Sequence, residues 1–150
     1  MASTISPRVF AAALVGVLTM LGAEYAAAQG RTYTPRRSSV ERKAIMNGLR
    51  PTVMRDLRQR VIFRVQHLRV SGKHAFIMAR PLRSNGGAID YRRTRFAADW
   101  KAGAFEDQVV ALMIRAGRRW QVVKYDIGAT DVVWEGWWNT YGAPRSIFPP

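Results

Sequence analysis

The stretch at residues 61–80 reads VIFRVQHLRVSGKHAFIMAR. Its first residues alternate between apolar and polar side chains, which is the period of a strand with one buried face. The alternation changes phase near Gln66 and His67, which predicts a β-bulge there. Gly72 lies at the centre of a turn, and a second apolar run follows until Pro81 limits the strand. The stretch therefore predicts a β-hairpin.

An amphipathic helix is predicted before this hairpin. Ser38 and Glu41 have the spacing of a capping box, in which each side chain bonds the backbone amide of the other residue. Apolar residues recur at helical spacing from Val40 onward. Pro51 lacks an amide hydrogen, so we expect the helix to be broken near Arg50.

A second hairpin is predicted after a less regular segment. Residues 84–87, SNGG, have turn composition, and 96–107 shows no clear period. Two apolar strands follow at 108–114 and 120–127, joined by a basic tip. The alternation in the two hairpins predicts the residues that face the helix, which are Phe63, Val65, Leu112, Trp120 and Val122.

A short C-terminal helix is predicted from Thr130, and Gly142 suits a left-handed cap at its end. Its aromatic residues fall on one helical face: Trp134, Trp137, Trp138 and Tyr141. Such a face usually packs into a core, and here it would cover the open end of the sheet. The alternative is a partly exposed platform for sugar rings or a peptide, which makes Trp134, Trp137 and Trp138 candidate ligand-binding residues.

The order helix, hairpin, irregular segment, hairpin and helix predicts an α+β fold, with an N-terminal helix packed on an antiparallel sheet of about four strands. This is the architecture of cystatin-like and NTF2-like domains. Residues 120–134, WQVVKYDIGATDVVW, together with YGAP at 141–144, resemble the C-terminus of small exported bacterial proteins of unknown function. Residues 63–76 are similar to their first hairpin. The resemblance implies a fold and export, and it brings no activity with it.

Residues 1–28 have the order of a secretory signal peptide. Arg8 supplies a positive charge, residues 9–23 are mostly apolar and uncharged, and 26–28 are alanines of the kind that a signal peptidase reads. We therefore predict cleavage after Ala28. A retained membrane anchor is the alternative, but the apolar stretch is shorter than the roughly 20 residues that span a bilayer.

Cleavage would leave a flexible leader over 29–37 and a single domain over 38–150, in the periplasm or outside the cell. The chain has no cysteine, so neither a disulfide nor a lipid-bearing cysteine holds it. A hydrophobic content of 48% is enough for a packed core in a domain of this length.

The chain carries a formal net charge of +14, and only four of its 24 basic residues are lysines. One explanation is an anionic partner such as lipopolysaccharide, anionic lipid, peptidoglycan or nucleic acid, which guanidinium groups bind through paired hydrogen bonds. Export disfavours nucleic acid. The other explanation is codon usage in a GC-rich genome, which leaves the shortage of acids unexplained. Arg92, Arg93 and Arg95 form the candidate binding cluster, whereas arginines such as Arg58 are expected to be scattered over the surface.

Candidates for catalysis are few. His67 and His74 are the only histidines and are placed to face each other across the first turn, but two ligands are too few for zinc. No serine lies in a nucleophile motif. Asp126, Asp131 and Glu135 lie near tryptophans, as the carboxylates of glycan hydrolases do. Acids at the start of a helix are equally well explained by the helix dipole.

We therefore expect no catalytic residue, no metal and no cofactor. The function that the sequence favours is a non-enzymatic domain that binds an anionic component of the cell envelope. The alternative is an NTF2-like hydrolase or isomerase with a pocket between helix and sheet.

The predicted processing site is open to direct measurement. Protein recovered from the periplasm should begin at Gln29, because the alanines before it are the small residues that a signal peptidase requires. Intact-mass spectrometry reads this start. Recovery of the full-length chain from the membrane fraction would contradict the prediction.

Overall fold

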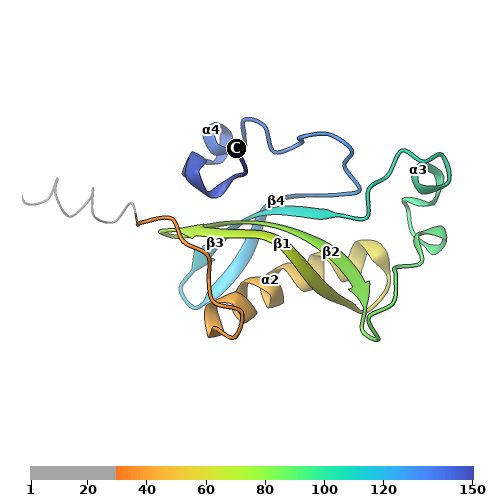
Figure 1. The fold of residues 1–150 in the computed structure, drawn as a ribbon, viewed down its shortest axis with the longest axis horizontal. Helices are drawn as coiled ribbons and strands as arrows, with labels where there is room; N and C mark the ends of the chain where they lie inside the picture. The colour runs from red at the N-terminus through yellow and green to blue at the C-terminus, as the bar shows by residue number, and fades with distance from the viewer. Residues whose placement is uncertain (1–29) are drawn as a thin grey trace, which may run out of the picture. The chain divides into compact units, whose positions relative to one another are not determined.

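The computed structural model describes residues 30–150, and the predicted signal peptide, 1–28, lies outside the described residues. One long helix, α2 (Val40–Leu57), precedes an antiparallel sheet whose strands lie in chain order, and these are β1 (Val61–Ser71), β2 (His74–Arg83), β3 (Val109–Ala116) and β4 (Arg119–Ile127). Figure 1 shows α2 on one face of the sheet and the C-terminal segment on the other. The predicted α+β class is confirmed.

Short helices occupy the connections. They are η1 (Tyr91–Arg93) and α3 (Ala97–Lys101) between the two hairpins, and α4 (Trp137–Tyr141) and η2 (Arg145–Ile147) near the C-terminus. The segment without a clear period thus folds into two helical turns. No helix within residues 30–150 combines the length and the apolar character that a membrane span requires.

The start of α2 lies one residue later than predicted. Ser39, and not Ser38, is the N-cap, and its hydroxyl oxygen accepts from the Arg42 amide at 3.1 Å. The carboxylate of Glu41 accepts instead from the Tyr33 hydroxyl at 2.8 Å. The predicted capping box is therefore wrong, because a contact from outside the helix engages the glutamate.

The helix also continues through Pro51, so the expected break near Arg50 is wrong. Proline removes one backbone hydrogen bond. That loss is outweighed by an unbroken apolar face, whose members on both sides of the proline are fully buried: Ile45, Leu49, Val53 and Leu57.

The first hairpin confirms the predicted bulge. The register of β1 against β2 shifts between Val65 and His67, which keeps Leu68 on the helix-facing side. Strand β2 does not stop at Pro81 and runs on to Arg83. Ala79 is the last residue of β2 that pairs with β3, so no β3 carbonyl is opposite the proline.

The second hairpin corrects one predicted face. Trp120 and Val122 pack with α2 as expected, and so do Phe63 and Val65, but Leu112 lies on the opposite face of the sheet. Residues 109–113 are all buried, so β3 is covered on both sides. An uninterrupted apolar run carries no alternation that would tell one face from the other.

The second face of the sheet is covered by the C-terminal segment. Its apolar cluster is centred on Phe76, which is fully buried, and includes Trp137, Ala143, Ile147 and Phe148. The helix that the sequence predicted from Thr130 begins only at Trp137. Gly136 before it has φ 77, a left-handed conformation that ends any helix arriving from Thr130.

Residues that the sequence assigns to the leader contact the edge of the sheet. The Tyr33 amide donates to the Val70 carbonyl at 2.9 Å, and the Val70 amide donates to the Tyr33 carbonyl at 2.8 Å. Pro35 is buried. This short pairing covers part of the otherwise open edge of β1.

The approach of α2 to β4 gives a stability prediction. A Cβ added at Gly48 would lie 2.2 Å from the Trp120 carbonyl oxygen. Glycine to alanine normally stabilises a helix by about 1 kcal/mol, but Gly48→Ala should lower the free energy of unfolding by about 1–3 kcal/mol because backbone must move. Chemical denaturation measures the change. Lys43→Ala, on the exposed side of α2, should stay within about 0.5 kcal/mol. A Gly48→Ala protein as stable as the parent would contradict the close approach.

Candidate functional site

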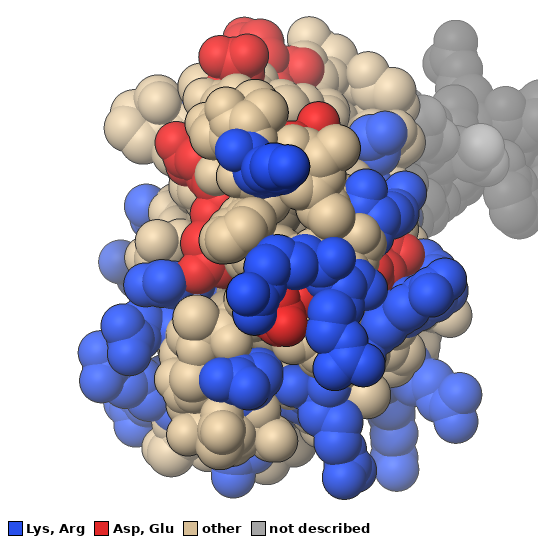
Figure 2. Space-filling view, turned by 90° about the vertical axis from the view of Figure 1, so that its right-hand side faces the viewer, with Lys and Arg blue, Asp and Glu red and all other residues tan. Residues whose placement is uncertain are grey.

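A basic hollow opens where the C-terminal end of α2 meets the loop that contains η1. Its volume is about 330 Å³, and its lining residues are Arg55, Asp56, Arg58, Arg93, Thr94 and Arg95. Four arginines and one aspartate are thus among its six lining residues. Figure 2 looks at the side that carries α3 and shows Lys and Arg side chains gathered around a smaller acidic area.

Asp56 holds two of these arginines in place. Its side chain is only 10% exposed, and Oδ2 accepts from Arg95 Nη2 at 2.7 Å and from the Tyr125 hydroxyl at 2.8 Å. Oδ1 lies 3.4 Å from Arg55 Nε, and Arg55 Nη2 donates to the Tyr125 hydroxyl at 3.2 Å. The bond to Tyr125 raises the pKa of the Arg55 guanidinium, which remains charged. Asp56 and Tyr125 therefore orient Arg55 and Arg95, and the hollow keeps a net positive charge.

Arg58 and Arg93 are the two arginines left over. Within residues 30–150, neither side chain has a hydrogen bond or an ion pair. Arg58 is also the C-cap of α2, with φ 53, and it is the one residue other than glycine in the described part of the chain that has a positive φ. Glycine is the usual residue at such a position, because a side chain is strained there. The guanidinium groups of Arg58 and Arg93 are therefore available to bind a ligand.

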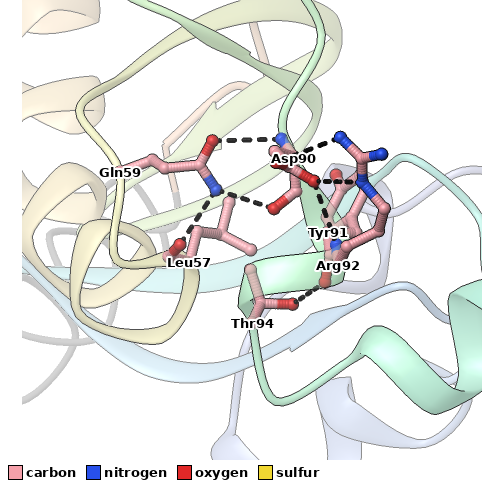
Figure 3. Close-up of polar contacts among 6 residues, drawn as sticks. All are labelled: Leu57, Gln59, Asp90, Tyr91, Arg92 and Thr94. Carbon is pink, nitrogen blue, oxygen red and sulfur yellow. Dashed lines mark hydrogen bonds and ion pairs between the residues drawn. The ribbon is translucent and has the colours of Figure 1, made fainter.

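Gln59 joins the loop to the end of the helix (Figure 3). Its Nε2 donates to the Leu57 carbonyl and to the Asp90 carbonyl, each at 3.1 Å, and its Oε1 accepts from the Asp90 amide at 3.0 Å. The Thr94 hydroxyl donates to the Tyr91 carbonyl at 2.8 Å and closes the turn. The two walls of the hollow are thus fixed to each other through backbone groups.

A buried tyrosine, Tyr91, fixes the loop that contains η1 to the core. Tyr91 is 3% exposed, and its hydroxyl donates to the Asp107 carboxylate, which also pairs with Arg80 Nε at 2.5 Å. Burial, followed by the bond to Asp107, raises the pKa of Tyr91 well above its usual range. The tyrosine therefore stays protonated and keeps its hydrogen bond.

Of the three arginines that the sequence singled out, the hollow contains two, Arg93 and Arg95. Arg92 points its guanidinium at its own loop, where Nε and Nη2 lie 2.9 and 3.3 Å from the two oxygens of Asp90. These bonds lower the pKa of the Asp90 carboxyl below its usual value. The charge of Arg92 is thus locally offset, and Arg92 does not line the hollow.

The sequence analysis missed two of the four arginines of the hollow, and also Asp56 and Thr94. Arg58 was expected to be isolated, which is wrong, because the loop returns to the helix end and places Arg93 and Arg95 beside it. Arg55 was not singled out at all. The available signal was weak: Arg55 and Arg58 are three residues apart at the end of a predicted helix, and such neighbours share a helical face.

An acidic hollow of about 230 Å³ lies on the other face of the sheet. Glu106, Asp126 and Asp131 line it together with Trp134. Asp131 and Glu135 were expected on one short helix, which is wrong, because α4 starts after both. Glu135 is not part of this lining.

The tryptophans proposed as ligand-binding residues belong to the second apolar cluster. Trp137 is 7% exposed, and the rings of Trp134 and Trp137 lie 5.7 and 6.3 Å from the Phe76 ring. Trp138 lies 5.5 Å from the Phe148 ring, and the Arg145 guanidinium covers it at 4.4 Å. The structure brings the three tryptophans together with one another, and not with the predicted arginine cluster.

The two histidines do not face each other, so that expectation is wrong. His67 pairs with Met78, and His74 pairs with Ser71. His67 Nε2 lies 2.8 Å from the Ile147 carbonyl oxygen, and burial lowers the pKa of His74. Among residues 30–150, no group of three or more His, Asp or Glu side chains is placed to hold a metal ion.

Comparison of the chain with protein-family models, with curated proteins and with solved structures finds no match. The chemistry of the basic hollow is therefore the basis on which a function can be inferred.

The backbone of Arg58 gives a prediction that separates fold from function. Arg58→Gly should be more stable than Arg58→Ala by about 1 kcal/mol, because glycine adopts a positive φ without strain. Urea denaturation of both variants measures the difference. An alanine variant that equals or exceeds the glycine variant in stability would show that φ 53 is not a strained position here.

Proposed function

We propose that this protein is an exported, non-enzymatic domain that binds an anionic component of the cell envelope through the basic hollow. The observation that carries the proposal is the composition of the hollow, whose lining has four arginines and a single carboxylate. That lining leaves an excess of three positive charges. An anion entering the hollow would balance them.

The arrangement of the arginines supports a phosphate or carboxylate ligand. Guanidinium groups present paired donors that match both anions. Arg55 and Arg95 are oriented in advance by Asp56, so little conformational freedom is lost when they bind. Arg58 and Arg93 supply donors that no described residue uses.

The envelope location rests on the signal-peptide pattern of residues 1–28. Envelope components with suitable chemistry are lipopolysaccharide, anionic lipid and peptidoglycan, because each presents phosphates or carboxylates. We further infer a cystatin-like or NTF2-like architecture, which the single long helix on a four-stranded antiparallel sheet supports.

The alternative, an NTF2-like enzyme, would need a pocket between helix and sheet. The described residues at that interface are closely packed: Leu49 and Val53 are fully buried, and Gly48 lies against the Trp120 backbone. The basic hollow lies at the end of α2, and the acidic hollow lies on the opposite face of the sheet. This packing favours the binding domain over the enzyme.

Charge reversal tests the proposal. The double variant Arg58→Glu/Arg93→Glu should bind purified lipopolysaccharide and inorganic pyrophosphate at least about tenfold more weakly, because each lost charged hydrogen bond removes a large share of the affinity. Calorimetry at low salt measures both ligands. Binding by the parent should also weaken steeply as salt rises, since the contacts are screened over about 10 Å at 0.1 M.

The matched control is Arg118→Glu/Arg119→Glu. These two arginines lie at the exposed tip between β3 and β4, and their reversal changes the net charge by the same amount. The control should lose much less affinity than the hollow variant. Equal losses would mean that only the overall charge matters, and no binding by the parent protein would remove the proposed function.

A further inference from the structure

Helix α3 is an exposed element that contributes nothing to the core. None of its residues is buried, and all residues from 98 to 104 are exposed. Trp100 on this helix is 46% exposed, and it is the one tryptophan of five that falls in the exposed class. A helix this short is held in proteins by the apolar surface that it buries. Packing into the core of this domain therefore gives no reason for a tryptophan at position 100.

The basic hollow lies directly beside α3. The Arg95 guanidinium, which lines the hollow, lies 4.7 Å from the centre of the Phe96 ring. The Trp100 amide donates to the Phe96 carbonyl at 2.9 Å, so Trp100 is one helical turn further along. The Phe96 and Phe105 rings pack at 5.4 Å and fix both ends of this segment to the domain. Figure 1 shows α3 at the outer edge, on the side that Figure 2 views.

The residues around Trp100 suit contact with a broad surface. Small side chains predominate over 97–104, where Lys101 is the one base and Asp99 the one acid. Trp100 is the one aromatic residue of this stretch, and its side chain is exposed. Tryptophan is also the residue that gathers at the boundary between lipid and water, because its ring is apolar and its N–H is polar.

We propose that this edge of the domain docks on an anionic lipid bilayer, with Trp100 in the headgroup region and the arginines of the basic hollow on lipid phosphates. The inference rests on the proposed function and names its ligand as phosphate presented by a membrane surface. The charge of the hollow and the sign of the membrane surface are complementary.

The lining of the hollow favours a headgroup over other phosphate-bearing ligands. It consists of arginine, aspartate and threonine side chains, with no aromatic ring on which a nucleobase could stack. It also lacks an apolar groove of the kind that anchors peptide side chains. The phosphate of a lipid headgroup needs neither an aromatic ring nor an apolar groove, so it fits this lining.

The test compares vesicles with a soluble phosphate ligand. The full mature chain is sedimented with vesicles of phosphatidylcholine, with and without phosphatidylglycerol, and its affinity for inorganic pyrophosphate is measured by calorimetry. Trp100→Ala should bind the anionic vesicles about tenfold more weakly, as expected for the loss of one large apolar side chain from the lipid interface. Its affinity for pyrophosphate should not change.

Two comparison variants make the result specific. Tyr141→Ala removes another exposed aromatic ring, from the end of α4, and should leave vesicle binding unchanged. Arg58→Glu/Arg93→Glu should lose both vesicle and pyrophosphate binding. Circular dichroism checks that Trp100→Ala is folded, which is expected because α3 buries no residue.

The outcomes separate this inference from the proposed function. If Trp100→Ala binds anionic vesicles as the parent does, the bilayer inference is wrong. It is also wrong if the parent binds pyrophosphate through the arginines but does not sediment with vesicles, and in that case the proposed function stands. If the parent binds neither anionic vesicles nor pyrophosphate, the inference is wrong, and if it also fails to bind lipopolysaccharide, the proposed function is wrong too.

Discussion

The close contact between Gly48 in α2 and the Trp120 carbonyl in β4 is the constraint on which the rest of the structure depends. At this point the backbones of the helix and the sheet meet directly, whereas apolar side chains such as Ile45 and Leu49 fill the rest of the interface. In the last turn of the helix, Asp56 accepts from the Tyr125 hydroxyl on β4 at 2.8 Å. This bond fixes the end of α2 to the sheet. Gln59 in turn binds Asp90 in the loop that contains η1, and this loop forms the other wall of the hollow.

The arginines at this place divide into those that the fold uses and those that it does not. Arg55 lies in the last turn of α2, where a cation interacts favourably with the negative end of the helix dipole. Arg95 is held by Asp56 and stacks on Phe96. Arg58 and Arg93 have no such role, and Arg58 occupies a backbone conformation that favours glycine. Strained backbone conformations persist where the surrounding structure holds them, and they are found often at functional sites.

The sheet separates two different surfaces of the same domain. Strands β2 and β3 are covered by α2 on one face and by the C-terminal segment on the other, so Trp134, Trp137 and Trp138 are largely used in packing. Trp100 lies outside both clusters. The one exposed tryptophan of the described residues is thus beside the arginines, and not among the tryptophans near the C-terminus.

The local residue pattern is enough to predict the two hairpins, the bulge near His67, the helix that begins near Val40 and the left-handed cap at Gly142, because each depends on neighbours within a few residues. Tertiary structure alone decided the face of Leu112, since a strand buried on both sides has no alternation to read. The tertiary structure also brings together the residues of the basic hollow. Arg58 and Arg93 are far apart in the chain, and they meet only because the helix end and the loop pack together. Charged residues on a surface follow no period in the sequence, so a sequence pattern cannot predict that two of them lie close together.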